Sequence, residues 1–372
     1  MNILTFIYLA IGLALLVGGA EMLVKGASKL AATVGVSPLI IGLTVVAFGT
    51  SAPELAVSLK ASLAGQADIA LGNVVGSNIC NVLLILGISA LIAPLIVAQQ
   101  LIRLDVPIMI GVSALLMLFG ADGGIGRSDG VILFLGGLAY TVFLLYQSRQ
   151  EKDQEVQDEY AKYGDRSLSL KETGLNVGLF LVGIGMLVYG SQMLVDSAVT
   201  IALFLGASPL IIGLTVVAFG TSLPELATSV TASLRGERDI AVGNVIGSNI
   251  FNILVVLGLT SAVSSTGIAI SASARSFDIP IMFAVAVMCL PICFTDNEIS
   301  RREGVLLVAY YLLYIGYMVA HATNPNAPWV GWIGLVVLPL TLLMMALLGW
   351  RTWRTMKKKR AVKEWQGRRE KH

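Results

Sequence analysis

The chain has 372 residues, of which 56% are hydrophobic and only 13% are charged; its net charge is +2 and its mean hydropathy is +0.83. A soluble domain carries about a quarter charged residues, so this composition excludes an ordinary soluble globular protein. Three cysteines and two histidines are too few and too scattered for a disulfide framework, a zinc site or a histidine-based catalytic centre. The composition predicts an all-α polytopic membrane protein.

Apolar runs of membrane-spanning length follow one another along the chain. Residues 1–146 form a first predicted unit with five spans, near 3–24, 36–62, 69–92, 104–120 and 129–146. A charged cytoplasmic loop is expected over residues 147–173. The second unit, residues 174–321, repeats the five spans near 175–196, 207–233, 240–263, 277–294 and 304–321. Residues 322–372 are expected to hold an eleventh span at 329–350, bracketed by tryptophans, and a basic cytoplasmic tail.

The two units are copies of each other. The segment SPLIIGLTVVAFGTSAPELAVSLKAS at 37–62 recurs at 208–233 as SPLIIGLTVVAFGTSLPELATSVTAS, with 22 of 26 positions identical. A duplicated unit with an odd number of spans enters the membrane from the opposite side the second time. The sequence therefore predicts two inverted-topology five-helix repeats, with ten core helices, a plan typical of transporters.

The distribution of basic residues predicts the orientation of the chain. With the N-terminus outside and the C-terminus in the cytoplasm, 22 of the 25 Lys and Arg residues lie on the cytoplasmic side, ten of them between Arg351 and Lys371. Only Lys60, Arg127 and Arg275 then lie outside. We expect a multi-pass protein of the plasma (inner) membrane, with its basic tail against anionic membrane lipid.

The duplicated segment carries polar residues that are costly inside a membrane. Glu54 lies one helical turn after Thr50, beside Ser51, and Glu225 follows Thr221 and Ser222 in the same way. A carboxylate within a membrane span marks a functional site. Prolines three residues after these threonines lack an N–H group, so with the preceding glycines they are expected to kink the span and to turn backbone carbonyls toward a cavity. These helix-breaking residues are Gly49, Pro53, Gly220 and Pro224.

The third span of each unit adds further oxygen atoms. Asn73, Ser77 and Asn81 are spaced four residues apart, and the second unit repeats them as Asn244, Ser248 and Asn252. Together with the carboxylates and hydroxyls they form a set of hard oxygen donors, which suits Ca²⁺ and Na⁺ and does not suit Zn²⁺ or Cu²⁺. Small residues in the same spans are expected to let helices approach closely. They are Gly72, Gly76, Gly243 and Gly247.

These motifs resemble those of the cation/calcium exchanger superfamily, specifically its prokaryotic sodium/calcium antiporters. GTSAPE and GTSLPE are similar to the two signature segments of that family, and GNVVGSNICN and GNVIGSNIFN are similar to their partner segments. The resemblance implies exchange of Ca²⁺ for Na⁺ by alternating access, with Ca²⁺ held between Glu54 and Glu225. It also implies that spans 2, 3, 7 and 8 surround the site and that long, tilted spans 1 and 6 slide past them.

The resemblance carries ion-binding residues onto matching positions of this chain. They are Ala47, Thr50, Ser51, Glu54, Ser77, Asn81, Ala218, Thr221, Ser222, Glu225, Ser248 and Asn252. Among these, the expected ligands of Ca²⁺ are Glu54, Glu225, Thr50 and Thr221. Supporting roles are expected for Gly49, Pro53, Gly220, Pro224, Asn73 and Asn244.

One position departs from the family pattern. Well-characterised sodium/calcium members have an aspartate where this chain has Asn252, and Asn81 is neutral as well. Two acids leave the number of exchanged Na⁺ ions open. They also keep a calcium/proton antiporter as the alternative, because a carboxylate pair can trade Ca²⁺ for two protons. A passive cation channel is a lower alternative, and K⁺ as an additional coupled ion stays open.

An enzyme is not expected from this sequence. Ser51 and Ser222 have no neighbouring histidine or lysine that could act as a base, so a serine nucleophile would not be activated. We expect no cofactor other than the transported Ca²⁺ and Na⁺, no nucleic-acid partner and no obligatory protein partner.

Overall fold

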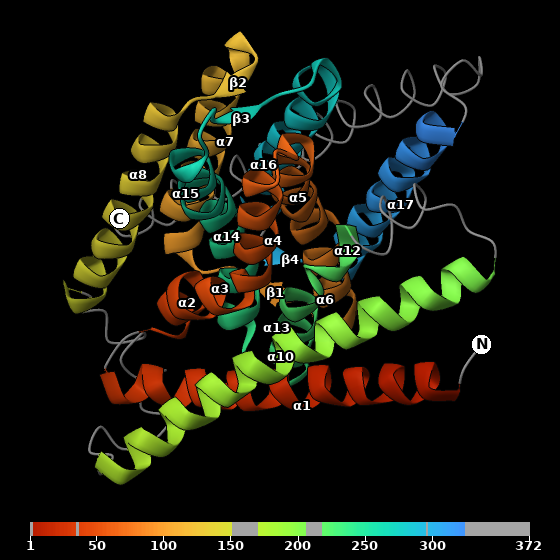
Figure 1. Ribbon diagram of the computed structural model, residues 1–372. Coiled ribbons are helices and arrows are strands. Elements are labelled where there is room, and N and C mark those ends of the chain that lie inside the picture. The colour runs from red at the N-terminus through yellow and green to blue at the C-terminus, as the bar shows by residue number, and fades with distance from the viewer. Residues whose placement is uncertain (1–2, 35–36, 151–169, 206–217, 295–296, 324–372) are drawn as a thin grey trace, which may run out of the picture.

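The computed structural model describes residues 3–34, 37–150, 170–205, 218–294 and 297–323 (Figure 1). These residues are almost entirely helical. The expected eleventh span, the basic tail and most of the central loop lie outside the described residues, as does the first part of the seventh span.

The first repeat begins with one long helix, α1 (Ile3–Val34), followed by a broken span and three further spans. The broken span consists of α2 (Pro38–Ile41), the π-helical η1 (Gly42–Val46), α3 (Ala47–Thr50) and α4 (Ala52–Leu63). The third span is α5 (Ala67–Cys80), the π-helical η2 (Asn81–Ile85) and α6 (Leu86–Ile92). The rest of the repeat is β1 (Leu95–Ile96), η3 (Leu101–Asp105), α7 (Val106–Phe119), η4 (Gly120–Asp122), β2 (Gly124–Ile125) and α8 (Arg127–Gln150).

The second repeat has the same order of elements. It starts with the long helix α10 (Leu170–Phe204) and continues with α12 (Ala218–Gly220) and α13 (Leu223–Leu234). Its third span is α14 (Arg238–Phe251), the π-helical η6 (Asn252–Leu257) and α15 (Gly258–Val263). It ends with β3 (Ile268–Ala269), η7 (Ala274–Asp278), α16 (Ile279–Phe294), β4 (Glu298–Ile299) and α17 (Arg301–Thr323).

The helices have the length and polarity of membrane spans. Within the described residues, eight helices are long and apolar enough to cross a membrane, and Pro38–Thr50 with Ala52–Leu63 forms a further span bent by 43°. A membrane span must be long and apolar enough to cross the hydrocarbon core, and its backbone groups must be hydrogen-bonded within the protein; these helices meet both requirements. The prediction of an all-α polytopic membrane protein is confirmed.

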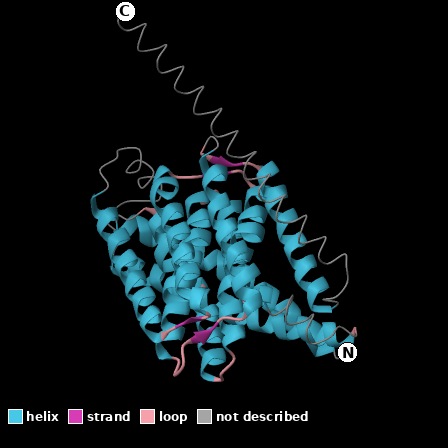
Figure 2. Cartoon of the chain, turned by 90° about the horizontal axis from the view of Figure 1, so that it is seen from above, coloured by secondary structure: helices cyan, strands magenta, loops and turns pink. Residues whose placement is uncertain are grey.

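Two small strand pairs reveal the inverted relation of the repeats. Strand β1 of the first repeat pairs antiparallel with β4 of the second, and β2 of the first pairs with β3 of the second. Because β1 and β3 occupy equivalent positions in the two repeats, each pair is the symmetry mate of the other. The pairs lie at opposite ends of the helices (Figure 2), as expected when one copy is turned over relative to the other.

The long helices α1 and α10 cross obliquely side by side along one face of the bundle (Figure 1). Glycines allow their backbones to touch: a Cβ added to Gly19 would lie 2.9 Å from the carbonyl oxygen of Gly183, and one added to Gly12 would lie 2.9 Å from that of Gly190. Small residues at such crossings permit the close packing that holds membrane helices together. Both helices are longer than the apolar runs expected at 3–24 and 175–196: α1 continues through Gly26 to Val34, and α10 extends from Leu170 to Phe204.

The third spans of the two repeats form the interior. The span Arg238–Val263 is buried throughout its most apolar window, whereas α1 exposes a broad apolar face. Helix α14 packs closely on the first half of the broken span, since a Cβ on Gly243 or Gly247 would lie 2.9 or 2.6 Å from the carbonyl oxygens of Leu39 or Leu43. The prediction of close helix approach is thereby confirmed at these two glycines. For Gly72 and Gly76, the equivalent partners lie in residues 206–217, outside the described part of the chain.

Candidate functional site

The break in the second span places Glu54 at the start of a new helix. The span bends by 43° around Ser51, and α4 begins at Ala52 with Pro53 in its first turn, followed by Glu54. Proline is tolerated there because the first N–H groups of a helix have no intrahelical acceptor. Ser222, Pro224 and Glu225 repeat this arrangement at the start of α13. The kink that Pro53 predicts is confirmed.

One carbonyl near the break does not face a cavity as the sequence suggested. The hydroxyl of Ser191 on α10 donates a hydrogen bond of 2.6 Å to the carbonyl oxygen of Gly220. Pro224 cannot donate to this oxygen, so the neighbouring long helix satisfies it instead. In the first repeat, the equivalent residue Gly49 also contacts α10 closely, because a Cβ added to it would lie 2.5 Å from the side chain of Ile184.

Glu54 is fully buried and is bonded by residues of both repeats. Its Oε1 lies 3.3 Å from the hydroxyl of Ser222 and 3.4 Å from that of Ser77, and these two hydroxyls lie 3.1 Å apart. Its Oε2 has no hydrogen-bond partner among the described residues. A buried carboxylate oxygen without a donor is costly, so this atom is available to an incoming ligand.

Glu225 is equally buried and mirrors this arrangement. The hydroxyl of Ser51 donates to its Oε1 at 3.2 Å, so each glutamate is bonded by the serine at the break of the opposite repeat. Its Oε2 and the hydroxyl of Ser248 have no hydrogen-bond partner in the described part of the chain. The two halves of the site thus differ, since Ser77 bonds Glu54 whereas Ser248 is left available.

Two asparagines join the threonines of one repeat to the glutamate backbone of the other. The hydroxyl of Thr50 donates to Oδ1 of Asn244 at 3.0 Å, and Nδ2 of Asn244 donates to the carbonyl oxygen of Glu225 at 3.4 Å. Thr221 and Asn73 form the equivalent contacts, at 3.1 Å between them and 3.0 Å to the carbonyl oxygen of Glu54. Both asparagines thus bridge the two repeats, and the supporting role expected of them stays a prediction.

Four buried amides meet where the third spans cross. Asn81 donates to Oδ1 of Asn249, and Asn252 donates to Oδ1 of Asn78, both at 3.0 Å. The Oδ1 atoms of Asn81 and Asn252 have no hydrogen-bond partner among the residues described. Each of these two residues begins a π-helical stretch, η2 or η6. Such local departures from α-helical geometry occur frequently at functional sites.

The structure brings nearly all the predicted site residues together and adds some that sequence reasoning left aside. Thr50, Ser51 and Ala47 lie at the end of the broken half-helix, where the carbonyl oxygen of Ala47 accepts a bond of 3.0 Å from the Ser51 amide and lies 3.3 Å from the Thr50 hydroxyl. Ala218 begins α12. Four residues were not among the predicted ion-binding or supporting residues, although their identity in both repeats was a signal that could have added them. They are Ser58, Asn78, Ser229 and Asn249.

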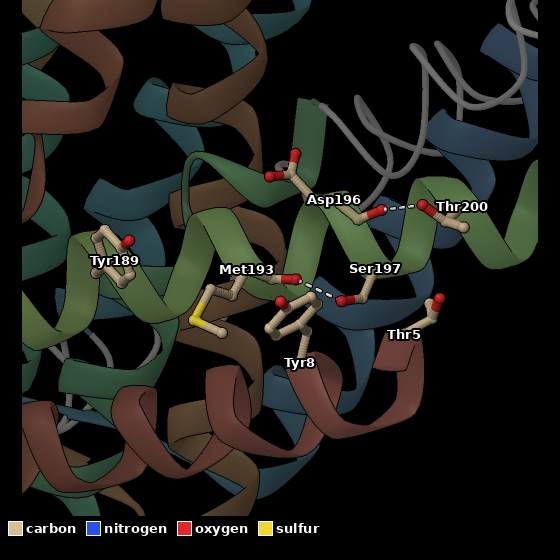
Figure 3. Close-up of a pocket in the computed structure, with 7 residues that line it drawn as sticks. All are labelled: Thr5, Tyr8, Tyr189, Met193, Asp196, Ser197 and Thr200. Carbon is tan, nitrogen blue, oxygen red and sulfur yellow. Dashed lines mark hydrogen bonds between the residues drawn. The ribbon is translucent and has the colours of Figure 1, made fainter. Parts of the chain in front are cut away.

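A separate pocket lies between α1 and α10, away from these residues (Figure 3). Thr5 and Tyr8 line it from α1, and Tyr189, Met193, Asp196, Ser197 and Thr200 line it from α10. The hydroxyls of Ser197 and Thr200 donate to carbonyl oxygens of their own helix, at 2.7 and 2.8 Å, as is common for such residues in membrane helices. The pocket contains none of the predicted ion-binding residues.

The fold and the site define a class: a polytopic helical transporter with a polar, oxygen-lined centre between inverted repeats. Comparison with known sequences narrows this class. The sequence profile of the family "Sodium/calcium exchanger protein" matches residues 4–148 and 175–320, which are the two repeats. The chain therefore belongs to the sodium/calcium exchanger family, whose members are transporters of cations and not enzymes.

Individual relatives agree with this assignment. The chain is 40% identical to the inner membrane protein YrbG of Escherichia coli over 83% of its own length and 95% of that protein. It is 34% identical to the sodium/calcium exchanger MaX1 of Methanosarcina acetivorans over 85% and 98% of the two chains. A solved structure of the sodium-calcium exchanger NCX_Mj, soaked with Na⁺ and Ca²⁺, superposes with a TM-score of 0.73 and 31% identity, covering 85% of this chain and 99% of that one.

Proposed function

We propose that this protein is a secondary antiporter that exchanges Ca²⁺ for Na⁺ by alternating access, with Ca²⁺ held between Glu54 and Glu225. Membership of the sodium/calcium exchanger family supports Ca²⁺ and Na⁺ as the transported ions. Members named sodium/calcium exchangers match the chain along almost their whole length.

The observation that carries the proposal is the pair of buried carboxylates. Each has one oxygen bonded by serines and one oxygen without a donor among the described residues. Two negative charges far from water require compensation, and a divalent cation supplies it in one ion. Two monovalent cations supply the same charge, so occupation by Ca²⁺ excludes occupation by Na⁺ and the reverse. This mutual exclusion is the physical basis of exchange.

The neutral oxygens of the site fit the same ions. The hydroxyls of Thr50 and Thr221 donate their protons to Asn244 and Asn73, so their lone pairs stay available for a cation. Ser248 contributes a further hydroxyl without a partner among the described residues. Ca²⁺ takes six to eight oxygen ligands, so these residues would complete its shell together with backbone carbonyls, including those of Ala47 and Ala218.

Alternating access is supported by how the long helices pack. Helices α1 and α10 touch each other through glycine backbones and expose much of their surface away from the interior. We infer that they move as one body relative to the site-bearing helices, which would require the contact between Ser191 and Gly220 to change. Such movement of one bundle against another around a fixed central site is the general transport scheme of inverted-repeat proteins.

The membrane and the orientation are part of the same proposal. The relative YrbG is named an inner membrane protein, and we infer the same location for this chain. The basic residues favour an outer N-terminus and a cytoplasmic C-terminus. In that orientation the β1–β4 pair lies on the cytoplasmic side and the β2–β3 pair on the outer side.

The experiment that tests the proposal is uptake of ⁴⁵Ca²⁺ into proteoliposomes at fixed pH, with and without an outward Na⁺ gradient. The same vesicles are then given an outward proton gradient in place of Na⁺. We expect uptake to follow the Na⁺ gradient. Uptake driven only by protons would overturn Na⁺ coupling and establish a calcium/proton antiporter, whereas flux without any counter-gradient dependence would establish a channel.

A further inference from the structure

We propose that Asn78 and Asn249 are positioning residues that turn the side-chain oxygens of Asn81 and Asn252, rather than their NH₂ groups, toward the transported ion. The inference rests on the proposed function, since it concerns how the same site holds its cation. A primary amide has an acceptor end and a donor end of nearly equal shape, so an asparagine serves a cation only if something fixes which end faces it.

The orientation of Asn78 is determined by two atoms that can only accept. Its Nδ2 lies 3.2 Å from the carbonyl oxygen of Asn249 and 3.7 Å from Sδ of Met282. Neither a carbonyl oxygen nor a thioether sulfur can donate a proton. Rotating this amide by half a turn would place its oxygen against both acceptors, so Nδ2 must face them.

The orientation of the Asn249 amide, in the second repeat, is determined in the same way. Its Nδ2 lies 3.3 Å from the carbonyl oxygen of Asn78 and 3.5 Å from Sδ of Met109. The two residues therefore hold each other across the pseudo-two-fold axis, each through the main chain of the other. All four amides of the cluster are at least 98% buried, so water does not compete for these bonds.

The fixed orientations of Asn78 and Asn249 determine the orientations of the amides of Asn252 and Asn81. Because Asn78 points Nδ2 away, its Oδ1 is left to accept a bond from Nδ2 of Asn252, at 3.0 Å. Asn249 accepts from Nδ2 of Asn81 at the same distance. The Oδ1 atoms of Asn81 and Asn252 are then the ends that remain, and both lack a partner among the described residues.

The remaining oxygens lie beside the site. Asn81 follows Ser77 by one helical turn, and the hydroxyl of Ser77 lies 3.4 Å from Oε1 of Glu54. A network that served only to join helices would satisfy every buried polar atom, because a buried polar atom without a partner destabilises the fold. This network instead leaves two acceptors of the same kind unsatisfied, in equivalent positions of the two repeats. It supplies oxygen ligands without adding charge to the two glutamates.

The experiment uses the full-length protein and a comparison of two backgrounds. Asn78→Leu removes the acceptor that holds the amide of Asn252, so that this amide can turn its NH₂ group toward the ion. In an Asn252→Asp background, Asn78→Leu cannot turn an NH₂ group toward the ion, because both ends of the carboxylate at position 252 are oxygens. ⁴⁵Ca²⁺ binding to the purified protein gives Kd, and exchange in proteoliposomes gives KM and kcat separately.

We expect Asn78→Leu to raise Kd and KM about tenfold in the wild-type background, with little change in kcat, and less than about twofold in the Asn252→Asp background. Asn249→Leu is the matched control. Asn249 holds Asn81, which is still an amide in the Asn252→Asp background. Asn249→Leu should therefore raise Kd and KM in that background as well.

Equal effects of Asn78→Leu in both backgrounds, or no effect in either, would overturn the inference. Asn78→Ala in the same two backgrounds provides a second variant if the leucine variant does not fold, as judged by gel filtration. Failure of the wild-type protein to bind Ca²⁺ would instead contradict the proposed function, so the two failures are distinguishable.

Discussion

The hydroxyl of Ser51 in the first repeat donates a hydrogen bond of 3.2 Å to Oε1 of Glu225 in the second repeat. The hydroxyl of Ser222 lies 3.3 Å from Oε1 of Glu54, which is the same contact in the opposite direction. Each carboxylate is therefore positioned by the broken span that carries the other one. Any movement that separates the breaks at Ser51 and Ser222 would remove a hydrogen bond from both glutamates at once. A conformational change during transport would therefore affect both carboxylates together.

The two glutamates are expected to be equally indispensable. Glu54→Gln and Glu225→Gln each keep the shape of the side chain but halve the negative charge that compensates a divalent cation. Each variant should lower ⁴⁵Ca²⁺ exchange in proteoliposomes at least about a hundredfold, with gel-filtration behaviour unchanged. Flux close to the wild-type level in either variant would show that the carboxylates do not share one site.

The serines at the breaks are expected to affect affinity more than folding. Ser51→Ala removes a hydrogen bond to a buried carboxylate, which contributes about 1.5 kcal/mol, so the KM for Ca²⁺ should rise about tenfold. Ser113→Ala is the matched control, because Ser113 is also buried but donates only to the carbonyl oxygen of Met109 in its own helix, at 2.8 Å. A similar KM for both alanine variants would mean that the Ser51 contact does not position Glu225.

The crossing of α1 and α10 should tolerate no added methyl group at its glycines. A Cβ on Gly183 would lie 2.7 Å from the backbone nitrogen of Leu23, whereas one on Gly185, two residues along the same helix, meets nothing within 4 Å in the described part of the chain. Gly183→Ala should therefore destabilise the protein by about 1–3 kcal/mol and reduce exchange.

Gly185→Ala is the internal control for that crossing, and it should be neutral or slightly stabilising because alanine favours a helix. Thermal unfolding of both variants in detergent, together with exchange in proteoliposomes, measures the difference. Equal melting temperatures for the two alanine variants would argue against close contact of these backbones in the membrane.

The orientation can be checked with a matched pair of exposed residues at equivalent positions in the repeats. Leu63 and Leu234 end α4 and α13, and both are exposed. In intact cells, a membrane-impermeant maleimide should label Leu63→Cys but not Leu234→Cys, since the basic residues place position 63 outside. The native cysteines are buried and should stay unlabelled. Labelling of only Leu234→Cys would reverse the topology.

The sequence by itself determined the class of fold, and it supplied the residues that we propose for the site. Hydropathy is a local property, and a bilayer accepts only helices or closed barrels, so apolar runs of sufficient length identified the spans. The duplication of Glu54 as Glu225 identified the repeats, and the odd number of spans in each repeat, five, identified their inversion. Proline chemistry predicted the break in the second span, which the structure shows as a bend of 43°.

Only the tertiary structure decided which atoms meet. Sequence spacing places Asn78 and Asn81 on one helix, but it cannot show that their amides meet Asn249 and Asn252 or which end of each amide is left unpaired. It also suggested a cavity-facing carbonyl at Gly220, which instead accepts a hydrogen bond from α10. Contacts between residues about 170 positions apart depend on how whole helices pack, and hydrogen-bond direction depends on every neighbour that surrounds the group.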